Sequence, residues 1–254
     1  MISSLPDPQP PIENQEQPQS PWSMVDLIVF AVFFALTVLL LPLTVIRVWR
    51  IFRPDLRLAD LTATDQVLLQ GVMNLVIVGF IVFLVRVVHR QSFTETIHWF
   101  RNHGFGTGFL ISLGATLAIS VLIVSSFFPA GEPPPIERLL SSTTAMYVFA
   151  IFGVVVAPLF EEIIFRGFLF KVLSDIRGPG TAVSMTAILF ALLHLPQLWG
   201  SWAGVVLIFV VGYVLSLVRQ RSNSLIPSFI IHTSYNCMLF GVFALSTLVQ
   251  KGVR

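Results

Sequence analysis

Long apolar runs, separated by short polar or proline-containing segments, dominate this chain. A helix needs about 20 apolar residues to cross the hydrocarbon core of a bilayer. Backbone in lipid must be helical or part of a closed barrel, and runs this long lack the alternation of barrel strands. The pattern therefore predicts an all-α, polytopic bundle of seven to eight membrane spans. The predicted spans are residues 24–46, 66–88, 107–129, 144–173, 181–195, 202–219 and 225–248.

The residues at the ends of the runs support these boundaries. All five tryptophans lie at or outside predicted span ends, as expected for a belt at the membrane–water interface: Trp22, Trp49, Trp99, Trp199 and Trp202. The proline-rich segment 129–135 predicts a polar loop, and 177–180 predicts a helix end. The run 144–173 is long enough to break near Pro158, and 86–101 predicts an amphipathic segment in the interface.

Composition agrees with a membrane protein. The chain is 55% hydrophobic and 11% charged, with a mean hydropathy of +0.85, whereas globular chains average about 25% charge. The single cysteine, Cys237, excludes an intramolecular disulfide framework. The chain contains no basic tract of the kind that binds nucleic acid. Residues 1–23 contain no Lys or Arg and are rich in Pro, Gln and Ser, which predicts a disordered tail.

Few ionisable residues remain deep inside the apolar runs. They are Glu161, Glu162, Arg166, His194 and His232, with Asn236 as a strongly polar companion. A carboxylate at the centre of a membrane helix costs roughly 2.5–3.5 kcal/mol on insertion scales. Such residues usually face the bundle interior and one another, so we expect this set to gather at one site.

Helical spacing orders this set. Glu162 and Arg166 are at i and i+4, with the acid on the N-terminal side, which favours an ion pair. Glu161 lies about 100° round the helix and is then free to point elsewhere. The same i, i+4 spacing places Phe190 beside His194. It also puts two hydrogen-bonding side chains on one face at 232 and 236.

One carboxylate, two imidazoles and an amide suit the hydrolysis of an amide bond. A carboxylate can take a proton from water, and an imidazole can share that water or protonate the leaving amine. A second histidine with an asparagine can donate to the developing oxyanion. The alternative is a catalytic Zn²⁺ site held by Glu161, His194 and His232, with one position left for water.

The same residues carry a resemblance to a known family. Glu161-Glu162-Ile-Ile-Phe-Arg166, Phe190-Ala-Leu-Leu-His194 and His232-Thr-Ser-Tyr-Asn236 resemble, in order, the EExxxR, FxxxH and HxxxN motifs of the CAAX protease and bacteriocin-processing family. This family includes the type II CAAX prenyl endopeptidases and their bacterial relatives, the Abi proteins. The resemblance covers roughly residues 144–240, so the chain divides into a tail at 1–23, N-terminal spans at 24–143 and a catalytic core at 144–248.

The resemblance implies roles for these residues in an intramembrane endopeptidase. Glu161 would be the catalytic glutamate and would activate water together with His194. Glu162 and Arg166 would form a supporting pair, and Phe190 would contribute packing. His232 and Asn236 would donate to the oxyanion or, in the metalloprotease description, belong to the metal site. The partners implied are the lipid bilayer and a protein or peptide substrate. The compact chain, in which no organellar targeting signal is identified, favours a multi-pass protein of a bacterial cytoplasmic membrane.

The same residues are also compatible with three other interpretations. The two acids could form a purely structural network with Arg166, and His232 and Asn236 could simply bridge helices. A buried cluster of this kind could also relay protons or bind a cation in a transporter. A third reading is a non-catalytic interaction or immunity protein with the same fold.

Overall fold

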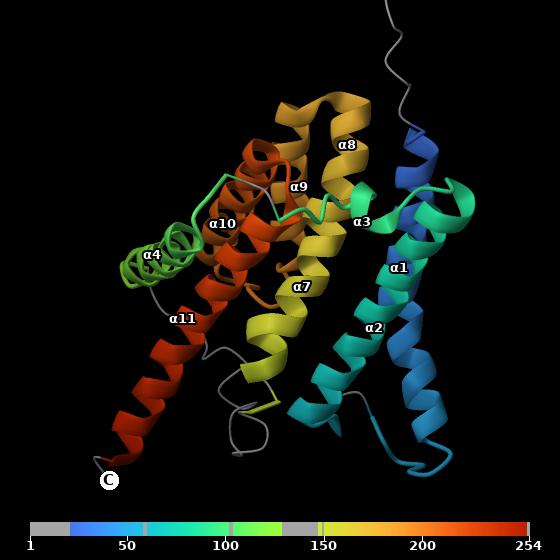
Figure 1. The fold of residues 1–254 in the computed structure, drawn as a ribbon. Helices are drawn as coiled ribbons and strands as arrows, with labels where there is room; N and C mark the ends of the chain where they lie inside the picture. Colours follow the sequence, from blue (N-terminus) through green and yellow to red (C-terminus); the bar gives the residue numbers. More distant parts are fainter. Residues whose placement is uncertain (1–20, 58–59, 102–103, 129–146, 149, 253–254) are drawn as a thin grey trace, which may run out of the picture.

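The structure of the chain is a computed structural model that describes residues 21–57, 60–101, 104–128, 147–148 and 150–252. Every regular element in these ranges is helical, which confirms the predicted all-α fold. Figure 1 shows the elements packed side by side as a bundle, with helices far apart in the sequence as neighbours. The predicted tail, apart from its last three residues, and the predicted loop at 129–135 lie outside the described residues.

Among the described residues, five helices are long and apolar enough to cross a membrane, which makes the chain an integral, multi-pass membrane protein. These candidate spans are Met24–Trp49, Thr64–Val88, Thr107–Ser125, Trp202–Ser222 and Leu225–Thr247. They correspond to helix α1 (Met24–Trp49), α2 (Ala63–Phe83) with its continuation η2 (Leu84–Val88), α4 (Thr107–Ser125), α10 (Trp202–Ser222) and α11 (Leu225–Gly252). All five match spans that the sequence predicts.

The other two predicted spans differ from simple crossing helices. The run 181–195 forms α9 (Pro179–Leu193), which has only 15 residues. The run 144–173 forms a composite helix that consists of η3 (Phe152–Val156), α7 (Ala157–Glu162), η4 (Ile163–Leu169) and α8 (Phe170–Arg177). η3 and η4 are π-helical, and the helix passes through Pro158 without the predicted break. It ends at Gly178, whose φ of 83° suits a glycine at a helix terminus.

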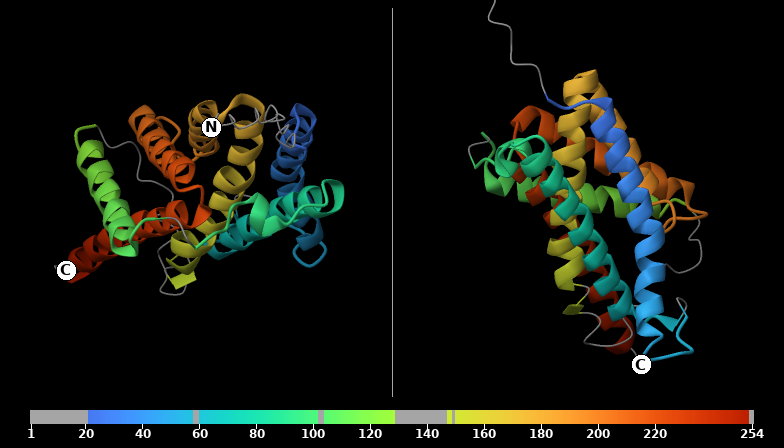
Figure 2. Two further views of the ribbon diagram at one scale, coloured as in Figure 1. Left: turned by 45° about the horizontal axis from the view of Figure 1, so that its top comes forward. Right: turned by 90° about the vertical axis from the view of Figure 1, so that its right-hand side faces the viewer.

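The composite helix forms the centre of the bundle. Every residue from Glu162 to Phe170 is buried. No other stretch of nine residues in the described part of the chain is buried throughout. α1 and α2 flank it on one side, and α9, α10 and α11 on the other (Figures 1 and 2). Phe168 is completely buried and packs in one cluster with Ile81 and Val85 from the α2–η2 helix. Two polar residues of the EExxxR motif, Glu162 and Arg166, thus lie in the most deeply buried stretch of the described chain.

Helix α4 packs closely against α11 at a glycine. A Cβ atom at Gly114 would lie 2.5 Å from the carbonyl oxygen of Ile231 and 2.7 Å from the Cβ of Ser234. Real atoms do not approach so closely, so a larger residue would push the two helices apart. Because Ile231 precedes His232, this contact fixes the part of α11 that carries the histidine.

The segment between α2 and α4 docks on the centre of the bundle. After η2, its described residues form a single short helix, α3 (Phe93–Thr96), followed by a turn, rather than one continuous amphipathic helix. Ile97 lies against Gly167 of η4, where an added Cβ would be 3.1 Å from the isoleucine side chain. The carbonyl of His98 accepts a hydrogen bond of 2.9 Å from the N–H of Leu225. The Ser224 hydroxyl donates to the carbonyl of Phe100 at 2.6 Å.

The turn after α3 contains His98, which should make the stability of the protein sensitive to acid. Burial, together with the positive charge of Arg219, lowers the pKa of His98 to about 4. Lys171 lowers this pKa further, and Asp175 and a hydrogen bond to the backbone of residue 223 oppose the shift. In the unfolded chain this histidine titrates near 6.5, so between pH 6.5 and about 4 the unfolded state binds more protons. The neutral His98 side chain therefore makes its full contribution to the free energy of unfolding above pH 6.5. This contribution falls as the pH drops towards 4.

The measurement is the thermal unfolding midpoint of the protein in nanodiscs at several pH values between 7.5 and 4.5. We expect the midpoint of wild-type protein to fall by more than that of the His98→Asn variant. Asparagine tolerates the positive φ of 56° at this position and does not titrate. Equal pH dependence of the two proteins would contradict the assignment.

Candidate active site

The two glutamates lie on the composite helix between its two π segments. Glu161 and Glu162 are the last residues of α7, with η3 before this short helix and η4 directly after it. A π turn contains one residue more than an α turn and occurs frequently at functional sites. The acids therefore occupy a stretch of helix whose geometry departs from the α-helix on both sides.

Glu162 and Arg166 form the ion pair that their spacing predicts. Arg166 Nη1 donates to Glu162 Oε1 at 2.9 Å, and both side chains are completely buried. Two residues of α10 satisfy the rest of the guanidinium: Nη2 donates to the carbonyl of Gly212 at 3.0 Å, and Nε approaches the hydroxyl of Ser216 at 3.4 Å. A buried charge needs such partners, because without them it would face the full desolvation penalty.

His232 lies between the two carboxylates. Its Nδ1 is 3.0 Å from Glu162 Oε1, and its Nε2 is 3.6 Å from Glu161 Oε2. A carboxylate only accepts, so the Nδ1–H donates to Glu162, which leaves Nε2 directed towards Glu161. The exposed fraction of the Glu161 side chain is 25%, against zero for Glu162. A polar chain therefore runs from Arg166 in the core to Glu161, the accessible acid of the pair.

His194 lies directly after the end of α9, where its orientation is fixed by its own helix. Its Nδ1 is 2.8 Å from the carbonyl of Phe190. Because a carbonyl can only accept, Nδ1 carries the proton and Nε2 is left as an acceptor. The direct polar contacts of the described residues do not join His194 to Glu161. The predicted pair would therefore have to act through a molecule held between them.

Phe190 connects the separate parts of the site by packing. Its ring centroid is 4.5 Å from that of His194 and 5.9 Å from that of His232. The guanidinium of Arg166 lies over the same ring at 4.4 Å, a cation–π contact. Gly212 makes room for the ring, since an added Cβ would be 3.1 Å from its edge. Phe190 is thus the packing residue that the motif spacing predicts.

Asn236 bridges two helices. Its Nδ2 donates at 2.8 Å to the carbonyl of Gly153, a residue of η3. That carbonyl has no helical donor, because Ala157 bonds to Phe152 and Pro158 has no N–H. The amide therefore completes the hydrogen bonding of the composite helix, and one of its two hydrogens is occupied there.

The side chains present do not form a ligand set for the predicted Zn²⁺ site. In the part of the chain that the structure describes, no three His, Cys, Asp or Glu side chains come close enough together to hold a metal ion. Each histidine keeps Nε2 available, because only Nδ1 is engaged, by the Phe190 carbonyl at His194 and by Glu162 at His232. The donor set that the sequence suggests, Glu161 with two histidines, is not assembled around a common point.

Comparison with known proteins shows a similarity over the region that contains this site. Residues 143–238 match the model of the type II CAAX prenyl endopeptidase Rce1-like family. The match covers less than half of the chain and shows that this region is similar to the Rce1-like family. It contains all three motifs and thus every predicted site residue, which confirms the resemblance.

A second similarity covers nearly the same length of sequence. The chain is 35% identical over 98 residues to the UPF0177 protein YxdF of Lactococcus lactis subsp. lactis (strain IL1403). The aligned part is 39% of this chain and 50% of that protein, so the chain spans about half the length of this relative. No solved structure matches the chain.

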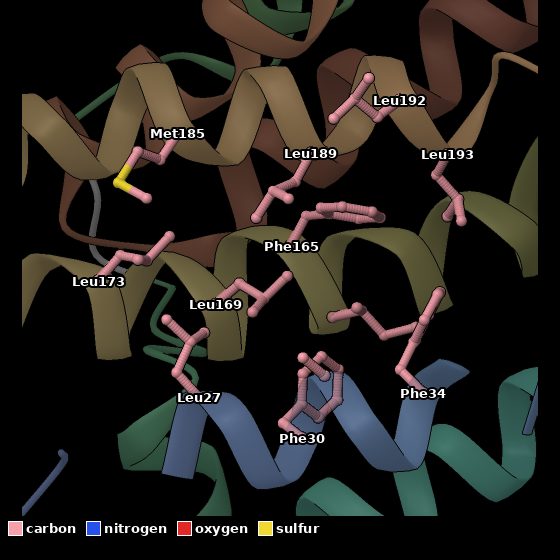
Figure 3. Close-up of a pocket in the computed structure, with 12 residues that line it drawn as sticks. Leu27, Phe30, Phe34, Phe165, Leu169, Leu173, Met185, Leu189, Leu192 and Leu193 are labelled. Carbon is pink, nitrogen blue, oxygen red and sulfur yellow. The ribbon is translucent and has the colours of Figure 1, made fainter. Parts of the chain in front are cut away.

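An apolar groove lies beside the Rce1-like site. It has a volume of about 490 Å³ and lies between α1, the η4–α8 part of the composite helix and α9. Figure 3 shows side chains from all three helices directed into the space between them. Phe165 in its wall is adjacent in sequence to Arg166, and Leu193 is adjacent to His194. α1 lies outside the Rce1-like region, so both halves of the chain build this groove.

α10 contributes residues to the site that none of the three motifs contains. Gly212, Ser216 and Arg219 of this helix all contact the EExxxR segment, and none belongs to a motif. Their only sequence signal is position, because 212, 216 and 219 follow an i, i+4, i+7 pattern on one helix face. The same face is completely buried at Leu215.

Proposed function

We propose that the chain is an intramembrane endopeptidase in which a water molecule attacks the peptide bond directly. The observation that supports this most strongly is the asymmetry of the acid pair. Glu162 is neutralised by Arg166 and bonded to His232, whereas Glu161 beside it is accessible and has no comparably close partner among the described residues. A purely structural ion pair needs only the first of these acids.

The proposed reaction uses Glu161 as the general base. A water held between its carboxylate and Nε2 of His194 loses a proton to Glu161 as its oxygen bonds to the carbonyl carbon of the substrate. The resulting tetrahedral intermediate collapses when the carbon–nitrogen bond breaks. The proton on Glu161 then passes to the leaving amine, and the products are a carboxylic acid and an amine. No acyl-enzyme forms, because the nucleophile is water.

His232 is the second histidine of this proposal. With Nδ1 fixed on Glu162, its Nε2 faces the accessible end of the site and, when protonated, can donate to the developing oxyanion. Asn236 holds the helix backbone at Gly153 and has one amide hydrogen left for such a role. His232 is therefore the stronger candidate for the oxyanion donor.

The function can be tested without knowledge of the natural substrate. Membranes from a host that expresses the wild-type protein are compared with membranes that contain Glu161→Gln protein at the same level, by mass spectrometry of peptide termini. We expect new termini only with the wild-type protein. Identical sets of termini would overturn the proposal. Repeating the comparison with a chelator tests for a metal, and we expect no change because the described side chains do not form a ligand set.

The groove suggests where an apolar part of the substrate binds. The family model describes prenyl endopeptidases, and a groove of about 490 Å³ lined by side chains such as Leu189 and Phe30 suits a hydrocarbon chain. We therefore propose that a hydrocarbon chain on the substrate lies in this groove while the adjacent peptide bond reaches Glu161.

A larger side chain in the groove should weaken substrate binding. In proteoliposomes, we expect Leu189→Trp to raise the KM for a farnesylated peptide ending in Cys and three further residues by about tenfold or more. Each buried CH₂ contributes about 0.8 kcal/mol, and loss of 1.4 kcal/mol is a factor of ten. Ile188→Trp is the matched control, because Ile188 is adjacent and exposed but does not line the groove. Equal KM values for the two variants would contradict this binding site.

A further inference from the structure

Arg219 is a buried arginine near the end of α10 that the proposed reaction does not use. Its exposed fraction is 2%, and its Nε donates at 3.0 Å to the main-chain carbonyl of Arg166. Its guanidinium also lies over the ring of Phe170 at 5.2 Å. Arg221, two residues further along the same helix, is exposed. A buried cation aimed at one backbone carbonyl indicates that this carbonyl needs a donor.

The π geometry of η4 explains why that carbonyl needs one. In a π segment the N–H of residue n bonds to the carbonyl of residue n−5, and in an α-helix to that of n−4. The N–H of Phe170 bonds to the carbonyl of Phe165, and α-helical bonding resumes in α8. Where the bonding changes from n−5 to n−4, one carbonyl between the two patterns receives no N–H from its own helix. This carbonyl is that of Arg166. Arg219 supplies the donor that the helix itself lacks.

The other π segment has the same arrangement with a different side chain. η3 ends when the N–H of Ala157 bonds to the carbonyl of Phe152, which passes over the carbonyl of Gly153. Asn236 of α11 donates to that carbonyl at 2.8 Å. Each π segment beside the acid pair is thus completed by a side chain from a neighbouring helix, and only Asn236 belongs to a motif.

We propose that Arg219 is a positioning residue that fixes the turn carrying Glu161, Glu162 and Arg166. It touches neither the water nor the substrate in the proposed reaction, and it acts by holding the backbone of η4 in its π conformation. The effect of Arg219 on catalysis rests on the proposed function, whereas its effect on the helix does not.

Three variants test this role: Arg219→Met, Arg219→Lys and, as the matched control on the same helix, Arg221→Met. In Arg219→Met we expect kcat for the farnesylated peptide to fall by about 10- to 100-fold with little change in KM, because small displacements of catalytic groups have effects of this size. Arg219→Lys keeps the charge and one donor and should recover part of the activity. Arg221→Met should behave as wild type.

Hydrogen–deuterium exchange provides a readout that does not depend on activity. We expect Arg219→Met to accelerate exchange in the peptide 160–171 and not in the peptide 107–125 of α4. Acceleration everywhere would indicate general destabilisation and would overturn the local role, as would exchange equal to that of Arg221→Met. If wild-type protein cleaves no peptide, the proposed function fails while the exchange result still decides the role of Arg219.

Discussion

Replacement of Glu161 by glutamine is expected to reduce peptide-bond hydrolysis by about 10²- to 10⁴-fold, the usual contribution of a general base. Glutamine has nearly the same shape as glutamate but cannot take a proton from water. The Glu161 side chain is partly exposed, and Nε2 of His232 is 3.6 Å from its Oε2. The substitution therefore removes the chemistry and leaves the packing of the buried segment 162–170 in place.

The measurement is the initial rate of cleavage in proteoliposomes, with thermal unfolding as the test of folding. Glu95→Gln is the matched control, because Glu95 is an exposed glutamate of α3. It should retain the wild-type rate and unfolding midpoint. A Glu161→Gln protein that folds normally and cleaves at the wild-type rate would exclude Glu161 as the base.

Replacement of Arg166 by methionine is expected to lower the free energy of unfolding by about 3–5 kcal/mol, the usual effect of removing one member of a buried ion pair. Methionine fills similar space but leaves Glu162 charged and completely buried, without the arginine that balances its charge. It also removes one of the two side-chain donors to the carbonyl of Gly212, which keeps the hydroxyl of Ser216. The measurement is unfolding in mixed micelles by increasing amounts of a denaturing detergent.

Two comparisons separate the loss of a buried pair from the loss of an arginine. Lys171 and Asp175 form an i, i+4 ion pair on α8 that is partly exposed, so Lys171→Met should change stability by no more than about 1 kcal/mol. Adding Glu162→Gln to Arg166→Met removes the stranded charge and should restore part of the stability. Equal destabilisation by Arg166→Met and Lys171→Met would contradict the importance of burial.

The sequence predicts the helices and the contacts within one helix well, because both depend on local periodicity. Apolar runs locate the five spanning helices, and i, i+4 spacing identifies the Glu162–Arg166 pair and the proximity of Phe190 to His194. The ordered motifs identify the Rce1-like region. These predictions require only that an apolar segment forms a helix.

Contacts between helices could not be predicted in the same way. Nothing local specifies that His232 meets both glutamates, that Asn236 donates to Gly153, or that Arg219 reaches the carbonyl of Arg166. The last two contacts arise from the π segments. A π segment forms when packing favours one more residue in a turn, and the hydrophobic pattern of a fully buried helix does not mark that residue.

The two π segments also make the glutamate helix sensitive to its length. Each extra residue turns everything beyond it by about 100° relative to an uninterrupted α-helix. η4 therefore determines the angle about the helix axis between the face of α7 that carries the acids and the apolar face of α8. On that apolar face Phe170 and Leu173 pack against α9. Loss of a single residue between 163 and 169 would let the helix relax to α geometry and rotate one face away from its partners. A one-residue deletion in this buried turn therefore changes more of the protein than most substitutions can.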